Sequence, residues 1–184
     1  MNKKNEKRQR VLNASIKVFS KRGYDLATID EIASKARVSK GTIFFYHRKK
    51  NQLIEAAALE SVPVEEISNI NEKEYSNAEE LLECFGLSFF KKYDNPDLRN
   101  LFLMAIANKG RYKQINAALR TICFQEMDKM FSKLEELVNA KVPIPIRRAF
   151  FGSLLCYVVW WDDNQITPEA YVRTLSKLIL QSIK

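Results

Sequence analysis

Side chains that can bind the phosphates and base edges of a nucleic acid gather between residues 39 and 49. Ser39 and Lys40 stand at the predicted start of a short helix, where free amides and the helix dipole favour phosphate. Lys40 can donate to guanine O6 or N7, and Thr42 can offer a hydrogen bond or a methyl contact to thymine. Gly41 would let this helix approach its neighbour or the groove closely. Two further candidates for contact with phosphate are Arg48 and Lys49.

Two short predicted helices position these groups. Thr28 followed by Glu31 is a capping box that begins a helix reaching to about Lys35, and Ser39 can cap the next helix. Residues 36–38 connect them, and the layout is that of a helix-turn-helix, whose second helix enters the major groove. A helix over about residues 5–22 precedes the pair and another, from about residue 49, follows it. The sequence therefore predicts a compact DNA-binding domain over residues 1–60.

Three stretches of this domain carry a family signature: GYDLATIDEIA at 23–33, ARVSKGTIFFY at 36–46 and KNQL at 50–53. Together they closely resemble the N-terminal signature of the TetR family of transcriptional regulators. The resemblance implies that Lys50 touches phosphate and that Thr28 presents its hydroxyl to the DNA backbone. Contacts of this kind position a protein on DNA without reading its sequence.

The chain departs from the family's pattern at several positions. Phe44 and Phe45 stand where Tyr is frequent, so contact with sugars or thymine methyls replaces hydroxyl contact to phosphate, and Tyr46 follows them. Arg37 replaces a usual turn Gly, which would cost on the order of 1 kcal/mol if the position needs a positive φ. Lys49 replaces the usual Ser or Asn cap. The only histidine, His47, stands where Phe is usual and is expected to pack or cap rather than to act as a ligand or base.

The excess of positive charge lies at one end of the chain. Of the net charge of +8, all belongs to residues 1–60, which hold 14 Lys or Arg and 6 Asp or Glu, whereas residues 61–184 hold 16 of each. Such asymmetry is typical of proteins that bind a phosphate backbone or an anionic membrane surface. The first basic residues form either a solvated helix face or a flexible arm that contacts DNA: Lys3, Lys4, Lys7, Arg8 and Arg10.

The rest of the chain is expected to be helical as well. Apolar residues recur at helical spacing over about 77–93, 97–108, 112–140, 146–161 and 168–184. The sequence therefore predicts an all-α fold with about nine helices, in which residues 61–184 sense a ligand and dimerise. No apolar run approaches the ~20 residues of a membrane span. Cys84, Cys123 and Cys156 are expected to be reduced core thiols of a cytoplasmic protein.

Aromatic and methionine side chains of this second part are core residues in the simplest interpretation, and together they could line a cavity. TetR-like proteins bind small inducers between their central helices, so the resemblance implies a pocket here. A lining rich in Phe and Met would suit an acyl chain or an aromatic compound. The candidates are Phe85, Phe89, Phe102, Met104, Tyr112, Phe124, Met127, Met130 and Phe131.

The predicted helix over about residues 146–161 is apolar around nearly its whole circumference. It must therefore be covered on more sides than a monomer's last two helices supply. Paired with the last helix, it would form a four-helix interface across a two-fold axis, as the TetR resemblance implies. The predicted interface residues are Phe151, Leu155, Val158, Val159, Leu175, Leu178 and Ile179.

These observations favour a homodimeric transcription factor, expected to be a repressor, that binds a pseudo-palindromic operator in double-stranded DNA and is released by a small apolar effector. One alternative is an architectural DNA-binding protein that needs no effector. A lipid-surface protein is disfavoured because Val11, Ile16 and Phe19 are already needed for a core. An enzyme is disfavoured because the sequence has no Gly-rich phosphate loop, no metal-ligand cluster and no nucleophile with a histidine partner; no cofactor or metal is expected.

Overall fold

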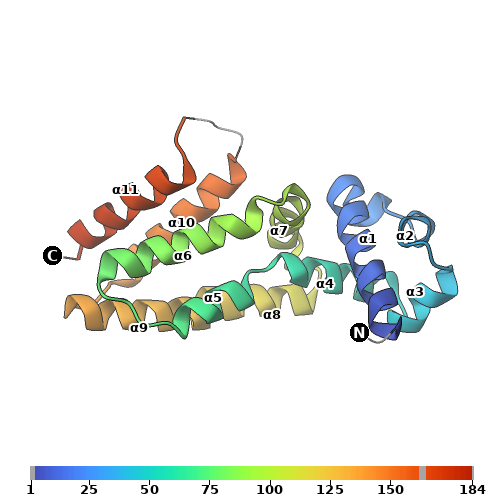
Figure 1. Cartoon of the computed structure of the whole chain (residues 1–184), viewed down its shortest axis with the longest axis horizontal. Coiled ribbons are helices and arrows are strands. Elements are labelled where there is room, and N and C mark those ends of the chain that lie inside the picture. The colour runs from blue at the N-terminus through green and yellow to red at the C-terminus, as the bar shows by residue number, and fades with distance from the viewer. Residues whose placement is uncertain (1–2, 162–164, 184) are drawn as a thin grey trace. The chain divides into compact units, whose positions relative to one another are not determined.

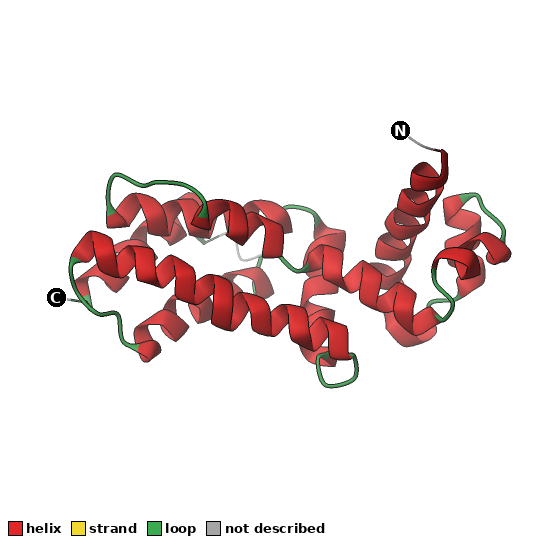
Figure 2. Cartoon of the chain, turned by 90° about the horizontal axis from the view of Figure 1, so that it is seen from below, coloured by secondary structure: helices red, strands yellow, loops and turns green. Residues whose placement is uncertain are grey.

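The computed structural model describes residues 3–161 and 165–183, and nearly all of them are helical (Figures 1 and 2). This part of the chain contains no β-strand, so the predicted all-α class is confirmed. None of its helices is both long enough and apolar enough to cross a membrane. The helices are α1 (Lys3–Leu26), α2 (Ile29–Ala36), α3 (Lys40–Tyr46), α4 (Lys50–Ser61), α5 (Val64–Asn71), α6 (Ala78–Tyr93), α7 (Pro96–Asn108), α8 (Lys113–Thr121), the π-helical segment η1 (Ile122–Glu126), α9 (Met127–Val138), α10 (Ile144–Val159) and α11 (Pro168–Gln181).

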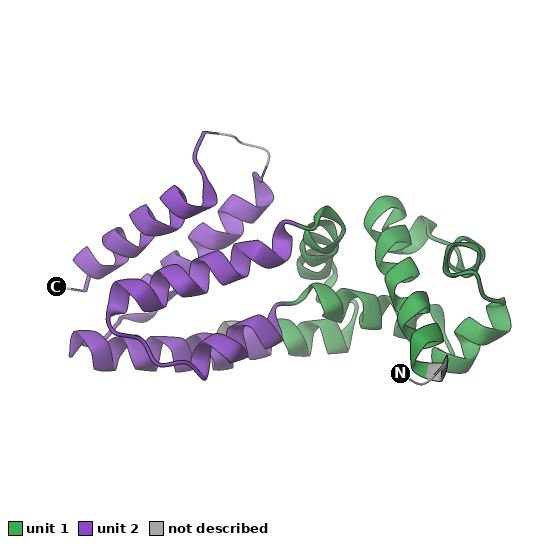
Figure 3. Ribbon diagram, in the orientation of Figure 1, with its two compact units in different colours: residues 1–62, 95–119 green, residues 63–94, 120–184 purple. Residues whose placement is uncertain are grey.

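The chain divides into two compact units (Figure 3). Unit 1 comprises residues 1–62 and 95–119, and unit 2 comprises residues 63–94 and 120–184. Helix α7 and most of α8 thus belong to the N-terminal unit although they come later in the chain. The functional division at residues 60 and 61 stays a prediction.

Unit 1 is built around α1. Val11 and Phe19 of α1 are fully buried, and α2, α4 and α7 all pack against this helix. The Ser20 hydroxyl donates to a carboxylate oxygen of Asp97 at 2.5 Å, which ties the start of α7 to α1. Gly23, the predicted end of the first helix, has a φ of 77° and breaks the regular helix, and one further helical turn follows it.

Unit 2 packs α6 against α10 and α11. Gly86 permits the close approach of α6 to α11, because a Cβ atom at this position would lie 2.7 Å from Cγ1 of Val172. The rings of Phe85 and Phe131 flank Phe150, with centroid distances of 5.7 and 6.1 Å. All three rings are fully buried, so this aromatic cluster is the centre of the unit's core.

Several local details differ from the sequence prediction. Residues 62–75 lack clear periodicity, yet residues 64–71 form α5, which buries Ile67 and Ile70. Ser76 followed by Glu79 predicts a capping box, but the cap of α6 is Asn77, whose side chain accepts a hydrogen bond from the Glu80 amide, while the Glu80 carboxylate accepts from the Ser76 amide. The helix predicted over about 112–140 is interrupted by η1.

The π-helical segment is anchored by polar contacts. The Asn71 side-chain amide donates to the Glu126 carbonyl at 3.1 Å and to its carboxylate at 2.9 Å. Lys129 also donates to that carboxylate, at 2.8 Å. Burial alone would raise the pKa of Glu126, but these hydrogen bonds outweigh it and lower the pKa. A buried, ionised side chain therefore links α5, η1 and α9.

The cysteines are less buried than predicted. Cys84 is half-buried, where the Tyr75 hydroxyl lies 3.8 Å from its Sγ, and Cys156 is exposed. The expectation of a core position is therefore wrong for Cys156, because none of the described residues covers the side of α10 on which it lies. The side chain of Cys123 lies outside those described.

Candidate DNA-binding interface

The capping box at the start of α2 is confirmed. The Thr28 hydroxyl accepts from the Glu31 amide at 3.2 Å, and the Glu31 carboxylate accepts from the Thr28 amide at 2.9 Å. The Thr28 amide, together with its hydroxyl and the nearby charge of Arg22, lowers the pKa of Glu31. Thr28 is exposed, so its hydroxyl is fixed at the surface at one end of α2.

The other end of α2 is held by Arg10 of α1. Its Nη2 donates to the carbonyls of Ala36 and Arg37 at 2.6 and 2.9 Å, and its Nε donates to Ala36 at 3.2 Å. Arg37 itself has φ 53° and ψ 51°, in the left-handed region. This positive φ meets the condition under which the missing Gly implies strain at this turn. The sequence does not predict the role of Arg10, because its partners are 26 and 27 residues away and leave no local pattern.

Replacing Arg37 by Gly should stabilise the protein. The left-handed conformation costs a residue with a Cβ about 1–2 kcal/mol, and the greater freedom of Gly in the unfolded chain offsets about 0.5–1 kcal/mol of this. We expect the free energy of unfolding in urea to rise by about 0.5–1 kcal/mol. Arg37→Ala is the matched control and should give no such gain. A lower stability of Arg37→Gly would contradict the strain argument.

Helix α3 begins with a side-chain cap and a charged pair. The Ser39 hydroxyl accepts from the Thr42 amide at 3.2 Å and lies 3.0 Å from the Thr42 hydroxyl. Lys40 Nζ lies 2.6 Å from a carboxylate oxygen of Asp30 in α2, and both side chains are more than half exposed. Asp30 is therefore a functional candidate that the sequence pattern did not indicate. Its carboxylate holds the amine of Lys40, which we predict to contact base edges.

Neutralising Asp30 should strengthen binding to DNA. Lys40 must leave this carboxylate to reach a base edge or phosphate, and an exposed ion pair is worth about 0.2–1 kcal/mol. We expect Asp30→Asn to raise the affinity for duplex DNA by up to about fivefold, measured by fluorescence anisotropy. Glu65→Gln in α5 removes a similar exposed charge and should leave the affinity unchanged. Weaker binding by Asp30→Asn would show that Asp30 orients Lys40 for recognition.

The rest of α3 presents aromatic side chains at the surface. Phe44 is 44% exposed and Phe45 is 68% exposed. The rings of Phe45 and Tyr46 meet edge to face at 5.2 Å. Gly41 is exposed as well. Large apolar side chains on a short surface helix suit contact with sugars and thymine methyl groups.

The start of α4 lies beside the start of α2. Lys50 Nζ donates to the Asp25 carbonyl at 3.1 Å, three residues before Thr28. Arg48 and Lys49 are exposed, and Lys49 occupies the cap position of α4 without a side-chain cap bond.

His47 ends α3 through its backbone amide, which donates to the Ile43 carbonyl at 2.8 Å. Burial, and then the charge of Arg8, lower the pKa of His47. The imidazole is therefore neutral near pH 7, which suits the expected packing role. No cluster of metal-binding side chains is found among the described residues.

The nine pocket candidates fall in different places. Phe102, Met104 and Tyr112 belong to unit 1. In unit 2, most of the others are packed in the core: Phe85, Phe89, Met127, Met130 and Phe131. Phe124, in η1, is 45% exposed, and it lines a cavity of about 190 Å³ together with Met127.

The seven interface candidates divide between core and surface. Four are buried within unit 2: Phe151, Val158, Leu175 and Ile179. Leu155 is half-buried, whereas Val159 and Leu178 are 48% and 55% exposed. Trp160, directly after α10, is 67% exposed. Helices α10 and α11 therefore leave large apolar side chains in water.

Two capped helices joined by a tight turn, with exposed polar and aromatic groups on the second, define a helix-turn-helix DNA-binding domain. Residues 11–57 match the family model described as bacterial regulatory proteins, tetR family. Residues 11–57 thus form the N-terminal domain that is found in bacterial regulatory proteins of the TetR family, and the fold of the chain is that of solved structures described as TetR-family regulators.

Curated relatives match chiefly in the N-terminal domain. The HTH-type regulator YerO of Bacillus subtilis is 40% identical over 53 residues, which is 29% of this chain and 18% of YerO. The match to YvdT of the same organism covers 27% of that protein. AcrR of Shigella flexneri is 24% identical over 148 residues, 74% of this chain and 66% of AcrR. The aligned segment thus spans well under two thirds of the first two relatives.

Solved structures match over nearly the whole chain. FadR from Bacillus subtilis, in complex with stearoyl-CoA, is 20% identical with a TM-score of 0.75, covering 96% of this chain and 100% of that one. FadR from Bacillus halodurans is 21% identical, with the same TM-score and coverage. At this identity the likeness establishes the fold.

Proposed function

We propose that the chain is a homodimeric repressor that binds a pseudo-palindromic operator in double-stranded DNA. Two copies of α3 would lie in successive major grooves, about 34 to 36 Å apart. The observation that carries this proposal is the exposure of Lys40, Phe44 and Phe45 on α3 within a TetR-type domain. Its place of action would be the cytoplasm, where bacterial DNA lies.

The groups of the proposed interface would have two roles. Lys40 and Thr42 would read base edges, with Phe44 and Phe45 in contact with thymine methyls or sugars. The others would position the domain on the phosphate backbone or permit close approach: Thr28, Ser39, Gly41, Tyr46, Arg48, Lys49 and Lys50.

The exposed apolar side chains of α10 and α11 support the dimer. Val159, Trp160 and Leu178 would be covered by the same helices of a second copy, in an isologous four-helix interface. Such an interface spaces the two copies of α3 for a palindromic site.

The cavity beside η1 is our candidate for an effector site. Its lining combines apolar side chains with charged ones: Phe124, Met127, Ile144 and Phe151 with Asp128, Arg147 and Arg148. The Arg148 guanidinium lies 4.5 Å from the centroid of the Phe124 ring. At about 190 Å³ the cavity is smaller than the ~300 Å³ of an ordinary ligand pocket, so it would hold only part of an acyl chain or an aromatic ring. The stearoyl-CoA bound to the similarly folded FadR favours an acyl compound.

The effector would act by binding the DNA-free conformation more tightly. Linkage then requires that DNA weaken effector binding by the same factor. Palmitoyl-CoA, palmitate and naphthalene are suitable probes in a thermal-shift assay. Stabilisation that Phe124→Ala abolishes, together with release of DNA, would support this site, whereas no shift with any probe would count against it.

Selection of bound sequences from a random duplex pool tests the operator proposal. We expect one inverted repeat to be enriched and bound at least ~1,000-fold more tightly than scrambled DNA. Steep dependence of binding on salt without an enriched motif would contradict sequence-specific regulation.

An effector-independent DNA-binding protein is the second candidate. The filled aromatic cluster around Phe150 favours it, because the middle of unit 2 is packed rather than hollow. The two candidates differ in the outcome of the ligand screen and of the sequence selection.

A further inference from the structure

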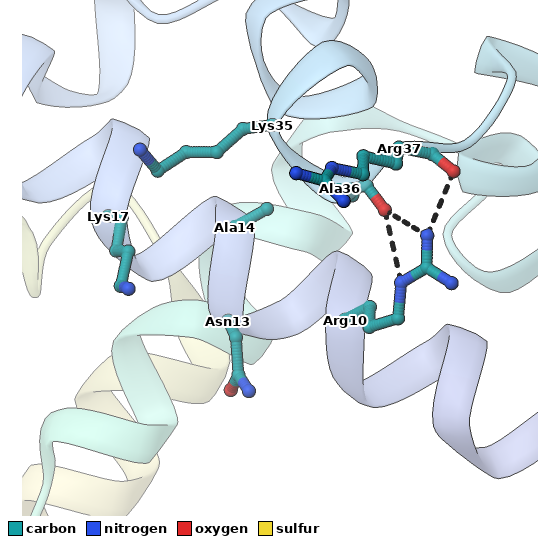
Figure 4. A pocket seen from close by; sticks show the side chains of 7 residues that line it. All are labelled: Arg10, Asn13, Ala14, Lys17, Lys35, Ala36 and Arg37. Carbon is teal, nitrogen blue, oxygen red and sulfur yellow. Dashed lines mark hydrogen bonds between the residues drawn. The ribbon is translucent and has the colours of Figure 1, made fainter.

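Unit 1 carries a basic concavity between α1 and the end of α2 (Figure 4). A pocket of about 480 Å³ is lined by Arg10, Asn13, Ala14, Lys17, Lys35, Ala36 and Arg37. Four of these seven side chains are cationic and none is acidic. We call the four, Arg10, Lys17, Lys35 and Arg37, the α1–α2 basin.

Three cations of the basin are not neutralised. Lys17, Lys35 and Arg37 are exposed, and none of them forms an ion pair with any residue in the described part of the chain. Lys40, by contrast, is paired with Asp30. A concave surface with charge of a single sign concentrates the electric field and attracts counterions. The basin is therefore prepared for an anion.

Arg10 removes the main obstacle to anion binding in the basin. The last carbonyls of a helix carry partial negative charge and repel anions. At the end of α2, Arg10 donates three hydrogen bonds to the carbonyls of Ala36 and Arg37, at 2.6 to 3.2 Å. Figure 4 shows these bonds, with Lys17 and Lys35 on the other side of the pocket. The guanidinium of Arg10 thus gives the pocket a positive charge at the end of α2, where uncovered carbonyls would make it negative.

The position of the basin on α2 indicates its partner. Helix α2 has 8 residues and is about 12 Å long, close to the width of about 12 Å of the major groove. Thr28 and Lys50 lie at its start, and Lys35 and Arg37 lie at its end, next to α3. With α3 in the groove, cations at the two ends of α2 would face phosphates on opposite edges.

We propose that the α1–α2 basin binds backbone phosphates of duplex DNA on the groove edge opposite to Thr28 and Lys50. This inference rests on the proposed function, since α3 must enter the groove. With the basin, the domain would contact phosphates on both edges of the major groove. Contacts on both edges would fix the tilt of α3 in the groove.

The test compares two double variants that remove the same charge. Lys17→Gln/Lys35→Gln neutralises the basin, whereas the control Lys109→Gln/Lys113→Gln neutralises exposed residues at the end of α7 and the start of α8. Affinity for a random-sequence duplex is measured over a salt series. Each lost phosphate contact lowers the slope of log K against log salt by about 0.9, so we expect the basin variant to lose about 1.8 and the control to match wild type. Thermal unfolding checks that both variants fold.

The outcomes distinguish a failure of the basin proposal from a failure of the proposed DNA-binding function. If wild type shows no salt-dependent binding, DNA binding itself fails. If wild type binds with a steep slope and the basin variant keeps that slope, only the basin proposal is overturned. Inorganic pyrophosphate serves as a second probe. If it stabilises wild type but not the basin variant, while the slope for DNA is unchanged, the basin binds a small anion and the assignment to DNA is wrong.

Discussion

Introducing aspartate at Val159 or Leu178 is expected to turn a dimer into a monomer. These side chains are 48% and 55% exposed in the single chain, and in the proposed interface a carboxylate there would be buried without a partner. Sedimentation at micromolar concentration should give a mass near 21.4 kDa for each variant and twice that for wild type. In a dimer, binding of one subunit to its half-site holds the second subunit close to the other half-site. A monomer loses this effect, so affinity for the selected inverted repeat should fall by at least ~100-fold.

Asn69→Asp in α5 is the matched control for added charge, because Asn69 is exposed and lies outside α10 and α11. It should remain dimeric and keep its affinity. A monomeric wild-type protein, or variants that stay dimeric, would rule out this interface.

Replacing Phe150 by Ala is expected to destabilise unit 2 by about 3–5 kcal/mol. Its ring is fully buried between Phe85 and Phe131, so the truncation removes contacts on both sides and leaves a cavity. Urea unfolding should show an earlier midpoint with a similar slope. Phe150→Leu keeps most of the volume and should cost clearly less. Similar small losses for both variants would mean that this cluster rearranges to fill the gap.

The N-terminal helices could be predicted closely because their signals are local. Thr28 with Glu31 and Ser39 before α3 specify helix starts within four residues, and the structure contains both caps. The missing turn Gly marked Arg37 as strained if its φ is positive, and the structure meets that condition. In such cases the partners of each hydrogen bond are neighbours in the sequence.

Contacts between distant segments could not be predicted in the same way. The clamp of Arg10 on α2 and the pair of Lys40 with Asp30 depend on how helices pack, and neither leaves a periodic pattern. The pocket candidates show the same limit. An apolar residue at helical spacing is predicted to face inward, but spacing does not tell whether it meets another ring, as Phe85 does, or a cavity, as Phe124 does.

The η1 segment lets α9 keep its buried face although the chain carries one more residue here than a regular α-helix would need. Buried positions recur every three or four residues from Tyr112 to Ile122, but among the described side chains the next buried apolar one, Met127, comes five residues later. One residue turns an α-helix by about 100°, so an uninterrupted helix would carry Met130 and Leu134 away from the core. Removing a single surface residue, Gln125, would bring Ile122 and Met127 to the ordinary spacing of four, so a regular α-helix could then keep Met130 and Leu134 in the core.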